Sequence, residues 1–210
     1  MKIKEKDLQF KREPRKRKST NCIFIHHSYS HDVSVKEIHR WHLDRDWIGV
    51  GYHFVVRTNG DIERGRPQGS VGAHAGATAN SDSIGVCLLG NFEEHEPTNR
   101  QIDSLVKLIN YLGEQYGELE IKGHSDVMNT SCPGRYFPWD VLRKRLKEAK
   151  KMAGKYFKDV PDDAWYADDI NKMYEEGLLK GHEDGTFRPE EPITRAEHAV
   201  TMRRLIEYLR

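Results

Sequence analysis

The feature that most constrains the fold is an uninterrupted apolar run, SIGVCLLG, at residues 83–90. A strand with one face in water alternates apolar and polar side chains, whereas a strand covered on both faces is apolar at nearly every position. The run therefore predicts a central strand that other elements cover on both sides. This indicates an α/β fold with a mixed central sheet flanked by helices.

Further strands are predicted on both sides of this run. The segment CIFIHH, residues 22–27, is bounded by polar residues, and GYHFVV, residues 51–56, alternates as a strand does. The pair Asn59-Gly60 is typical of a tight turn and predicts a short strand after it. A last short strand is expected around residues 121–122. We expect these strands to join the central strand in one sheet.

Helix starts are marked by capping boxes, in which Ser or Thr is followed three residues later by Glu or Gln. This pattern occurs at Ser34 and at Thr98, and apolar residues at helical spacing follow both. A third, basic helix is predicted over residues 139–152. We expect the first domain to cover residues 1–152.

The C-terminal part of the chain differs from the rest in its charge. Residues 1–18 have a net charge of +6, whereas residues 156–210 have a net charge of −5. In the acidic part, one helix is predicted from Trp165 to Glu176, and TRAE at residues 194–197 is a third capping box that opens a closing helix. We therefore expect a second, small all-α domain over residues 156–210, with a thin core.

Composition and charge exclude several classes of protein. The sequence has no run of the roughly 18–20 apolar residues that span a membrane, so no membrane segment is expected. The basic N-terminus has no apolar stretch behind it, which argues against a secretory signal peptide. It also lacks a motif with interleaved aromatic residues, so we interpret it as a solubilising terminus and expect no nucleic-acid partner. Three cysteines, an odd count, give no reason to expect a disulfide framework.

One polar stretch, IKGHSDVMNTSCPG at residues 121–134, contains two potential metal ligands. His124 and Cys132 offer an imidazole nitrogen and a thiolate, which zinc prefers, and a catalytic zinc site needs three such ligands. The third ligand should lie at the end of a rigid strand, where His26 and His27 stand. Because strand alternation sends these two side chains to opposite faces, only one can reach the metal, and periodicity does not decide which.

Five segments in conserved order along this chain resemble the type-2 N-acetylmuramoyl-L-alanine amidases. These are zinc amidases of the phage lysozyme type, which share a fold with animal peptidoglycan recognition proteins. The segments are IFIHHS, VGYHFVV, GAHAG, NSDSIGVCLLGNF and GHSDVMNTSCPG. The resemblance covers about residues 8–148. It implies a hydrolase that cleaves the amide bond between N-acetylmuramic acid and L-alanine in peptidoglycan.

The resemblance also implies roles for individual residues. The family's first zinc histidine ends the first strand and precedes a variable residue and a Ser or Thr, which matches His26 and leaves His27 as the variable position. One Zn²⁺ per chain is implied, with a zinc-activated water that attacks the amide. The implied zinc ligands are His26, His124 and Cys132, the implied catalytic residues are Tyr52 and Thr130, and the implied substrate-binding residues are His74 and Asn80. Phage members often carry lysine where this sequence has Thr130, so no role that needs a cation is expected there.

The C-terminal segments FKDVPDDAWYADDI and GLLKGHEDGTFRPEEPITRAE resemble one surface-layer homology repeat. Such repeats tether proteins to secondary polysaccharides of Gram-positive cell walls. The family's glycan-contacting tryptophan and TRAE arginine match Trp165 and Arg195. A guanidinium suits a carboxylate-bearing glycan because it can donate to both oxygens. The family usually combines three repeats, whereas this sequence has one.

Together the two resemblances imply an enzyme of the bacterial cell wall. We expect a phage endolysin that stays in the cytoplasm of a Gram-positive host until lysis and then acts on the wall. The expected partners are peptidoglycan and, through the C-terminal module, a secondary cell-wall polysaccharide. An alternative is a non-catalytic peptidoglycan-binding module, like recognition proteins that have lost zinc. Such proteins usually replace the residues that match Cys132 or Tyr52, and both are present here.

Overall fold

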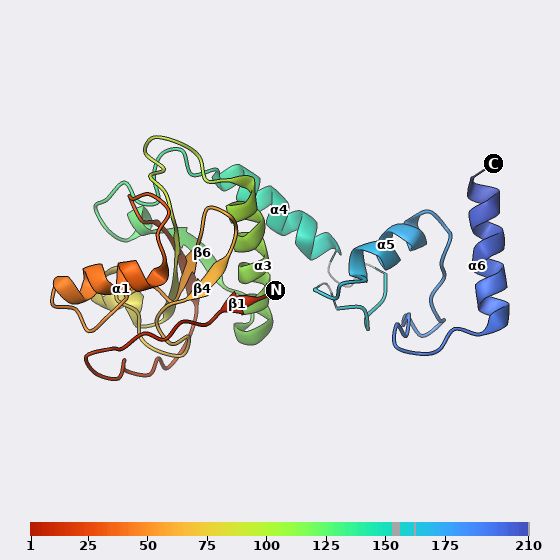
Figure 1. Cartoon of the computed structure of the whole chain (residues 1–210), viewed down its shortest axis with the longest axis horizontal. Coiled ribbons are helices and arrows are strands. Elements are labelled where there is room, and N and C mark those ends of the chain that lie inside the picture. Colours follow the sequence, from red (N-terminus) through yellow and green to blue (C-terminus); the bar gives the residue numbers. More distant parts are fainter. Residues whose placement is uncertain (153–155, 162, 210) are drawn as a thin grey trace. The chain divides into compact units, whose positions relative to one another are not determined.

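A computed structural model describes residues 1–152, 156–161 and 163–209 (Figure 1). The chain divides into two compact units, Met1–Arg143 and Lys144–Arg210. The division falls inside helix α4, Trp139–Met152, which has the bounds predicted for the basic helix. The domain limits at residues 152 and 156 therefore stay predictions.

The first unit is built on one six-stranded sheet with the order β1-β4-β3-β5-β2-β6 (Figure 1). Neighbouring strands are parallel except β3 and β4, which are antiparallel. The mixed sheet with flanking helices confirms the predicted fold class. The strands are β1 Ile3–Lys4, β2 Cys22–His27, β3 Phe54–Val56, β4 Ile62–Arg64, β5 Ser83–Leu88 and β6 Glu120–Gly123.

Strands β5 and β2 form the buried centre of the sheet. All six residues of each strand are buried, as the apolar run at residues 83–90 predicts for β5. Helix α1, Val35–Asp44, packs Val35 and Ile38 against Val55 and Cys87 on one face of the sheet. Helix α3, Asn99–Tyr116, covers the other face (Figure 1).

The caps of α1 and α3 explain where these helices begin. The Ser34 hydroxyl accepts a hydrogen bond from the Glu37 backbone N–H, at 3.4 Å. At α3, the Thr98 hydroxyl accepts from the Gln101 N–H, and the Gln101 side chain accepts from the Thr98 N–H, which completes the predicted capping box.

Among the described residues, neither α3 nor any other helix has the length and apolar character needed to cross a membrane.

The hairpin of β3 and β4 follows the turn signal at Asn59-Gly60, where Gly60 has φ of 89°. Strand β3 is shorter than predicted because regular pairing begins only at Phe54. The two residues before it are still held by the backbone: the His53 N–H donates to the Gly85 carbonyl, and the Tyr52 carbonyl accepts from Arg66. Tyr52 is therefore fixed in place although it lies outside a regular strand.

The basic N-terminal arm packs onto the first unit, and its interpretation as a solubilising terminus stays a prediction. Strand β1 pairs with β4 at the edge of the sheet, and Leu8 and Phe10 pack against the core under α1. Three lysines of the arm form ion pairs with acidic residues of the domain, Lys4 with Asp61, Lys6 with Glu63 and Lys11 with Asp46. Three of the nine basic residues of the arm are thus paired with acidic residues of the domain.

The second unit carries two helices of its own, α5 at Ala167–Glu175 and α6 at Arg195–Tyr208. Its core is small and consists of Phe157, Val160, Ala167 and Ile170. The capping box predicted at the start of α6 is present, with the Glu197 N–H donating to Thr194. All residues of α6 are described, and none of them is buried. A packed all-α domain therefore stays a prediction.

Candidate functional site

The centre of the site lies where two parallel strands end side by side. Strands β2 and β6 are neighbours, and their last paired residues are Ile25 and Gly123. One residue further along each strand are His26 and His124, the latter opening a short 3₁₀ helix at His124–Asp126. Because the carboxyl ends of parallel strands meet at one edge, the two imidazoles are brought together although 98 residues separate them in the sequence.

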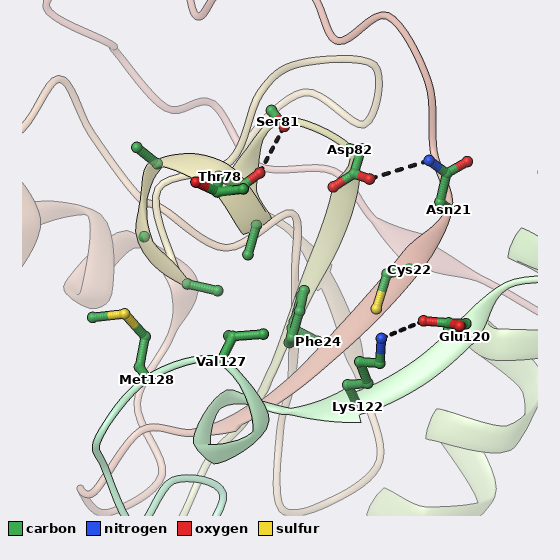
Figure 2. Close-up of a pocket in the computed structure, with 14 residues that line it drawn as sticks. Asn21, Cys22, Phe24, Thr78, Ser81, Asp82, Glu120, Lys122, Val127 and Met128 are labelled. Atoms are coloured by element: carbon green, nitrogen blue, oxygen red, sulfur yellow. Dashed lines mark hydrogen bonds and ion pairs between the residues drawn. The ribbon is translucent and has the colours of Figure 1, made fainter.

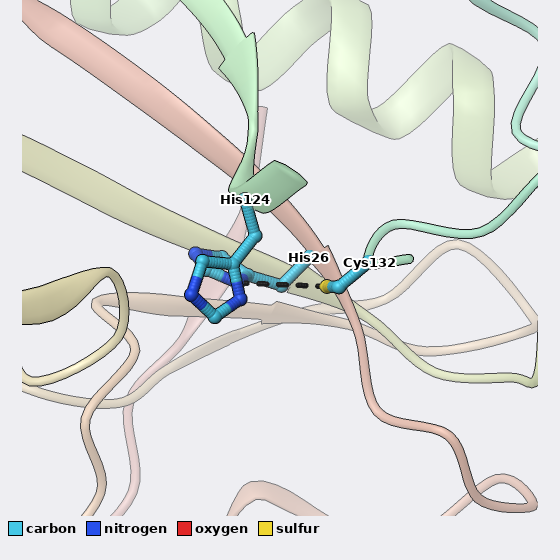
Figure 3. Close-up of side chains that lie close together, drawn as sticks. All are labelled: His26, His124 and Cys132. Carbon is cyan, nitrogen blue, oxygen red and sulfur yellow. Dashed lines mark hydrogen bonds between the residues drawn. The ribbon is translucent and has the colours of Figure 1, made fainter. Parts of the chain in front are cut away.

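The loop after His124 folds back and brings Cys132 to the same place. The Ser125 N–H donates to the Cys132 carbonyl at 2.8 Å, and the Asp126 carboxylate accepts from the Gly123 N–H at 2.8 Å. The ligand atoms of His26, His124 and Cys132 all lie within 4.8 Å of one another. Figure 3 shows the three side chains converging, with Cys132 Sγ 3.7 Å from His26 Nδ1.

This cluster has the donor set and spacing of a catalytic zinc site. A tetrahedral zinc ion with bonds of about 2.0–2.3 Å holds its ligands roughly 3.5 Å apart, which the 3.7 Å separation already approaches. His26 and Cys132 are buried, whereas His124 is only partly buried, so one side remains open to a fourth ligand. The three side chains fit a zinc ion better than the purely oxygen-based sites of magnesium or calcium.

Burial favours the uncharged forms of the three candidate ligands. Burial lowers the pKa of His26 well below its usual value, and that of His124 is also lowered by burial, so both imidazoles are neutral and able to ligate. Burial raises the pKa of Cys132 to about 11, although the hydrogen bond from the His27 N–H acts in the opposite direction. A cation at the cluster would offset this effect of burial and stabilise the thiolate.

The structure distinguishes His26 from His27. The ring of His26 lies in the cluster, 4.7 Å from the ring of His124. The ring of His27 is engaged elsewhere, since its Nδ1 accepts a hydrogen bond from the Phe92 N–H at 3.0 Å. The backbone N–H of His27 nevertheless supports the site, because it donates to Cys132 Sγ at 3.4 Å. This backbone contact carries no signal in the sequence.

Tyr52 stands beside the cluster. Its ring centroid lies 5.1 Å from that of His26. Burial is the main cause that raises the pKa of Tyr52 well above its usual value, with smaller contributions from Cys87 and Cys132. The phenol is thus a neutral hydrogen-bond donor. Its catalytic role stays a prediction.

Thr130 lies exposed in the ligand loop. Its hydroxyl accepts a hydrogen bond from the Cys132 N–H at 3.3 Å, and its own N–H donates to the Met128 carbonyl. The side chain therefore helps to shape the backbone next to a ligand. Its predicted contact with substrate or water is a separate role and stays a prediction.

His74 and Asn80 lie behind the cluster. His74 Nδ1 is 3.1 Å from His26 Nε2, and the Asn80 side-chain oxygen accepts from the backbone N–H groups of His74 and Ala75. Both residues are buried. Binding of substrate by these two residues stays a prediction. Their side-chain hydrogen bonds in the structure are to other groups of the protein.

A pocket of about 550 Å³ is lined by residues of β2, β6, α2 and the ligand loop, and none of the three cluster residues is among them (Figure 2). Phe24 lines it and lies on the same face of β2 as His26, two residues away. Helix α2, Gly76–Asn80, and the segment 127–128 of the ligand loop form other parts of its wall. Its rim carries Asp82 and an ion pair of Lys122 with Glu120. No sequence motif predicts this pocket, although small residues of GAHAGATA line part of it.

The two residues predicted to bind wall polymer lie in the second unit. The side chain of Trp165 is 88% exposed, and its ring lies 5.4 Å from that of Tyr166. Arg195 is exposed at the first position of α6. Exposure of both makes them available to a ligand, and the role itself stays a prediction.

Comparisons with known proteins agree with this geometry. Residues 16–135 match the family described as N-acetylmuramoyl-L-alanine amidase, and residues 156–199 match the S-layer homology domain. The endolysin of Klebsiella phage KP32 is 40% identical over 126 residues, which are 56% of this chain and 83% of that protein. The endolysin of Escherichia phage T7 is 37% identical over 134 residues, 60% of this chain and 85% of that protein. The solved structure of the amidase LysC from Clostridium intestinale aligns with a TM-score of 0.67 and 35% identity, over 70% of this chain and 98% of that chain.

Proposed function

The chain belongs to the N-acetylmuramoyl-L-alanine amidase family, and from this premise we propose that it is a zinc-dependent enzyme with one ion per chain. It is a peptidoglycan hydrolase, and the bond that the family name specifies joins N-acetylmuramic acid to L-alanine. The observation that carries the zinc proposal is the convergence of His26, His124 and Cys132, with all ligand atoms within 4.8 Å.

The ligand set suits hydrolysis near neutral pH. Two neutral imidazoles and one thiolate would leave the centre with a net charge of +1. When bound, zinc lowers the pKa of water to about 7 and polarises a carbonyl oxygen. Because His26 and Cys132 are buried and His124 faces the open side, substrate can approach from only one direction.

Tyr52 is proposed to stabilise the charge that develops on the amide oxygen. Its pKa is raised by burial, so the hydroxyl keeps its proton and can donate a hydrogen bond. The donor is held in place by backbone bonds on both sides, as the Tyr52 carbonyl accepts from Arg66 and the next residue pairs with Gly85. Thr130 is proposed to add a second, weaker hydrogen bond from the ligand loop.

The pocket in Figure 2 is proposed to receive the peptide side of the substrate. The scissile amide joins a sugar to a peptide, so one side of the site must accommodate an extended chain. The pocket shares β2 and the ligand loop with the cluster, and small side chains such as Ala75 and Ala79 leave room along its wall. His74 and Asn80, predicted from the sequence to bind substrate, lie next to this wall.

The second unit is proposed to attach the enzyme to a secondary cell-wall polysaccharide through Trp165 and Arg195. Its similarity to the S-layer homology domain and the exposure of both side chains support this role. An endolysin with such a module would act on the wall of a Gram-positive host from the inside, after leaving the host cytoplasm at lysis.

A chelation experiment tests the enzymatic proposal. Purified protein is added to Gram-positive cell walls, and turbidity is followed before and after complete removal of zinc and after its return. We expect clearing to stop without zinc and to resume with it, and mass spectrometry to detect peptides with a free N-terminal alanine. Clearing that persists without zinc would contradict the proposed chemistry. Binding without clearing in every condition would identify a non-catalytic peptidoglycan-binding module.

A further inference from the structure

We infer that His74 is a positioning residue, which holds His26 in the tautomer that directs an unprotonated Nδ1 toward the metal position. This inference rests on the proposed function in that it assumes a metal held by His26. It assigns to His74 a role inside the protein, whereas the sequence resemblance places the same residue at the substrate.

The first step concerns the two nitrogens of His26. Its Nδ1 faces the cluster, 3.7 Å from Cys132 Sγ, and its Nε2 faces away, 3.1 Å from His74 Nδ1. A neutral imidazole carries one proton, and the nitrogen that ligates a metal must be the one without it. A ligating His26 therefore carries its proton on Nε2, and it donates that proton to His74 Nδ1.

The second step concerns the proton of His74. If His74 Nδ1 accepts from His26, the proton of His74 must be on Nε2. This Nε2 is buried and has no hydrogen-bond partner among the described residues. Buried polar groups without a partner are uncommon in folded proteins. The contact that the ring does make is through its other nitrogen, to His26.

The surroundings of His74 are shaped to hold its ring in this one position. Asn80 fixes the backbone, because its side-chain oxygen accepts from the N–H groups of His74 and Ala75 at 2.8 and 2.9 Å. Two glycines lie against the ring. A Cβ atom at Gly72 would lie 2.5 Å from the ring of His74, and one at Gly85 would lie 2.4 Å from it.

The burial of His74 separates this role from direct contact with substrate. One ring nitrogen is within hydrogen-bond distance of His26, and the other has no exposed surface. Acceptors that bond the outer nitrogen of a metal-binding histidine fix its orientation and tautomer, and their loss lowers metal affinity by about tenfold to a hundredfold. A residue that contacts only substrate would leave metal affinity unchanged.

Two variants of similar size test the role of the acceptor. In His74→Asn, the side-chain oxygen can occupy the place of Nδ1, whereas His74→Leu has no acceptor. Zinc affinity is measured for both by competition with a chromophoric chelator, and KM and kcat are measured on peptidoglycan fragments. We expect His74→Leu to bind zinc about tenfold to a hundredfold more weakly with little change in KM, and His74→Asn to recover most of the affinity. Unchanged zinc affinity with a raised KM in both variants would overturn the inference.

A measurement on the unsubstituted protein decides the question even if both variants fail to fold. Long-range ¹H–¹⁵N NMR spectra of the metal-free protein report which nitrogen of His26 carries the proton. We expect Nε2, and a proton on Nδ1 would overturn the inference. This NMR measurement requires neither hydrolysis nor bound zinc. Absence of zinc binding by the unsubstituted protein would reject the proposed function, whereas the tautomer of His26 would still be measured. Failure of the inference and failure of the proposed function are therefore distinguishable.

Discussion

The two units of this chain use their apolar side chains in opposite ways. In the first unit, every residue of β2 and β5 is buried, and the candidate metal ligands lie in β2, directly after β6 and in the loop that follows. In the second unit, α6 buries no residue, and large side chains such as Trp165, Ile193 and Leu209 are exposed. Under the proposed functions, chemistry is placed on a buried, solvent-excluding scaffold, whereas attachment to the wall would use side chains that the fold leaves exposed.

The largest effect is expected for Cys132→Ser, which removes the only sulfur donor of the cluster. A hydroxyl is a much poorer zinc ligand than a thiolate, so we expect zinc content to fall below stoichiometric and turnover to fall to about a hundredth or less. Metal analysis and release of N-terminal alanine measure both. Cys22→Ser is the matched control for zinc content, since it makes the same chemical change on β2 at a buried cysteine outside the cluster. Its turnover is not compared, because Cys22 lines the pocket that we propose for the peptide. Equal losses of zinc in the two variants would show general damage to the scaffold.

The next largest effect is expected for Tyr52→Phe. This change removes one hydroxyl and keeps the ring that packs 5.1 Å from His26. We expect zinc to stay bound while kcat falls by roughly a hundredfold to a thousandfold, which is typical for loss of one oxyanion donor. If the variant keeps the full rate, the Tyr52 hydroxyl has no catalytic role and the side chain serves only to pack the site.

Much of the scaffold could be predicted because its signals are local. The apolar run at residues 83–90, the turn at Asn59-Gly60 and the capping box at Thr98 each depend on a few neighbouring residues, and each is found in the structure. The position of strand β1 could not be predicted in this way. It depends on pairing with β4, about sixty residues away, and a two-residue strand has no periodicity to detect.

The site shows the same limit. Donor chemistry pointed to His124 and Cys132, but the choice of His26 over His27 came from resemblance and not from strand periodicity. The contact of His26 with His74 and the pocket in Figure 2 depend on how α2 packs against β2, and no local pattern describes that packing. Contacts between elements that are distant in the sequence could therefore not be predicted from one sequence alone.

An intermediate effect is expected for Phe10→Ala, which tests whether the N-terminal arm belongs to the rigid unit. Phe10 packs against the core and lies 4.9 Å from the ring of His39. Losing a partly buried phenylalanine should lower the free energy of unfolding by about 2 kcal/mol. Thermal or denaturant unfolding measures this change. Gln9→Ala, at the exposed neighbouring position, is the control. If Phe10→Ala is as stable as Gln9→Ala, the arm does not contribute to the stability of the first unit.

The smallest effect on the fold is expected for Trp165→Ala in the second unit. Because this side chain is 88% exposed, its removal should change the free energy of unfolding by no more than about 0.5 kcal/mol. Cosedimentation with intact Gram-positive walls should nevertheless weaken roughly tenfold, since exposed tryptophans carry a large share of binding energy where they contact a ligand. Hydrolysis of soluble peptidoglycan fragments should be unchanged, because the cluster of His26, His124 and Cys132 lies entirely in the first unit. Unchanged cosedimentation would mean that the exposed Trp165 side chain does not bind the wall. The two units would then differ in how their side chains pack, but not in the way we propose for their functions.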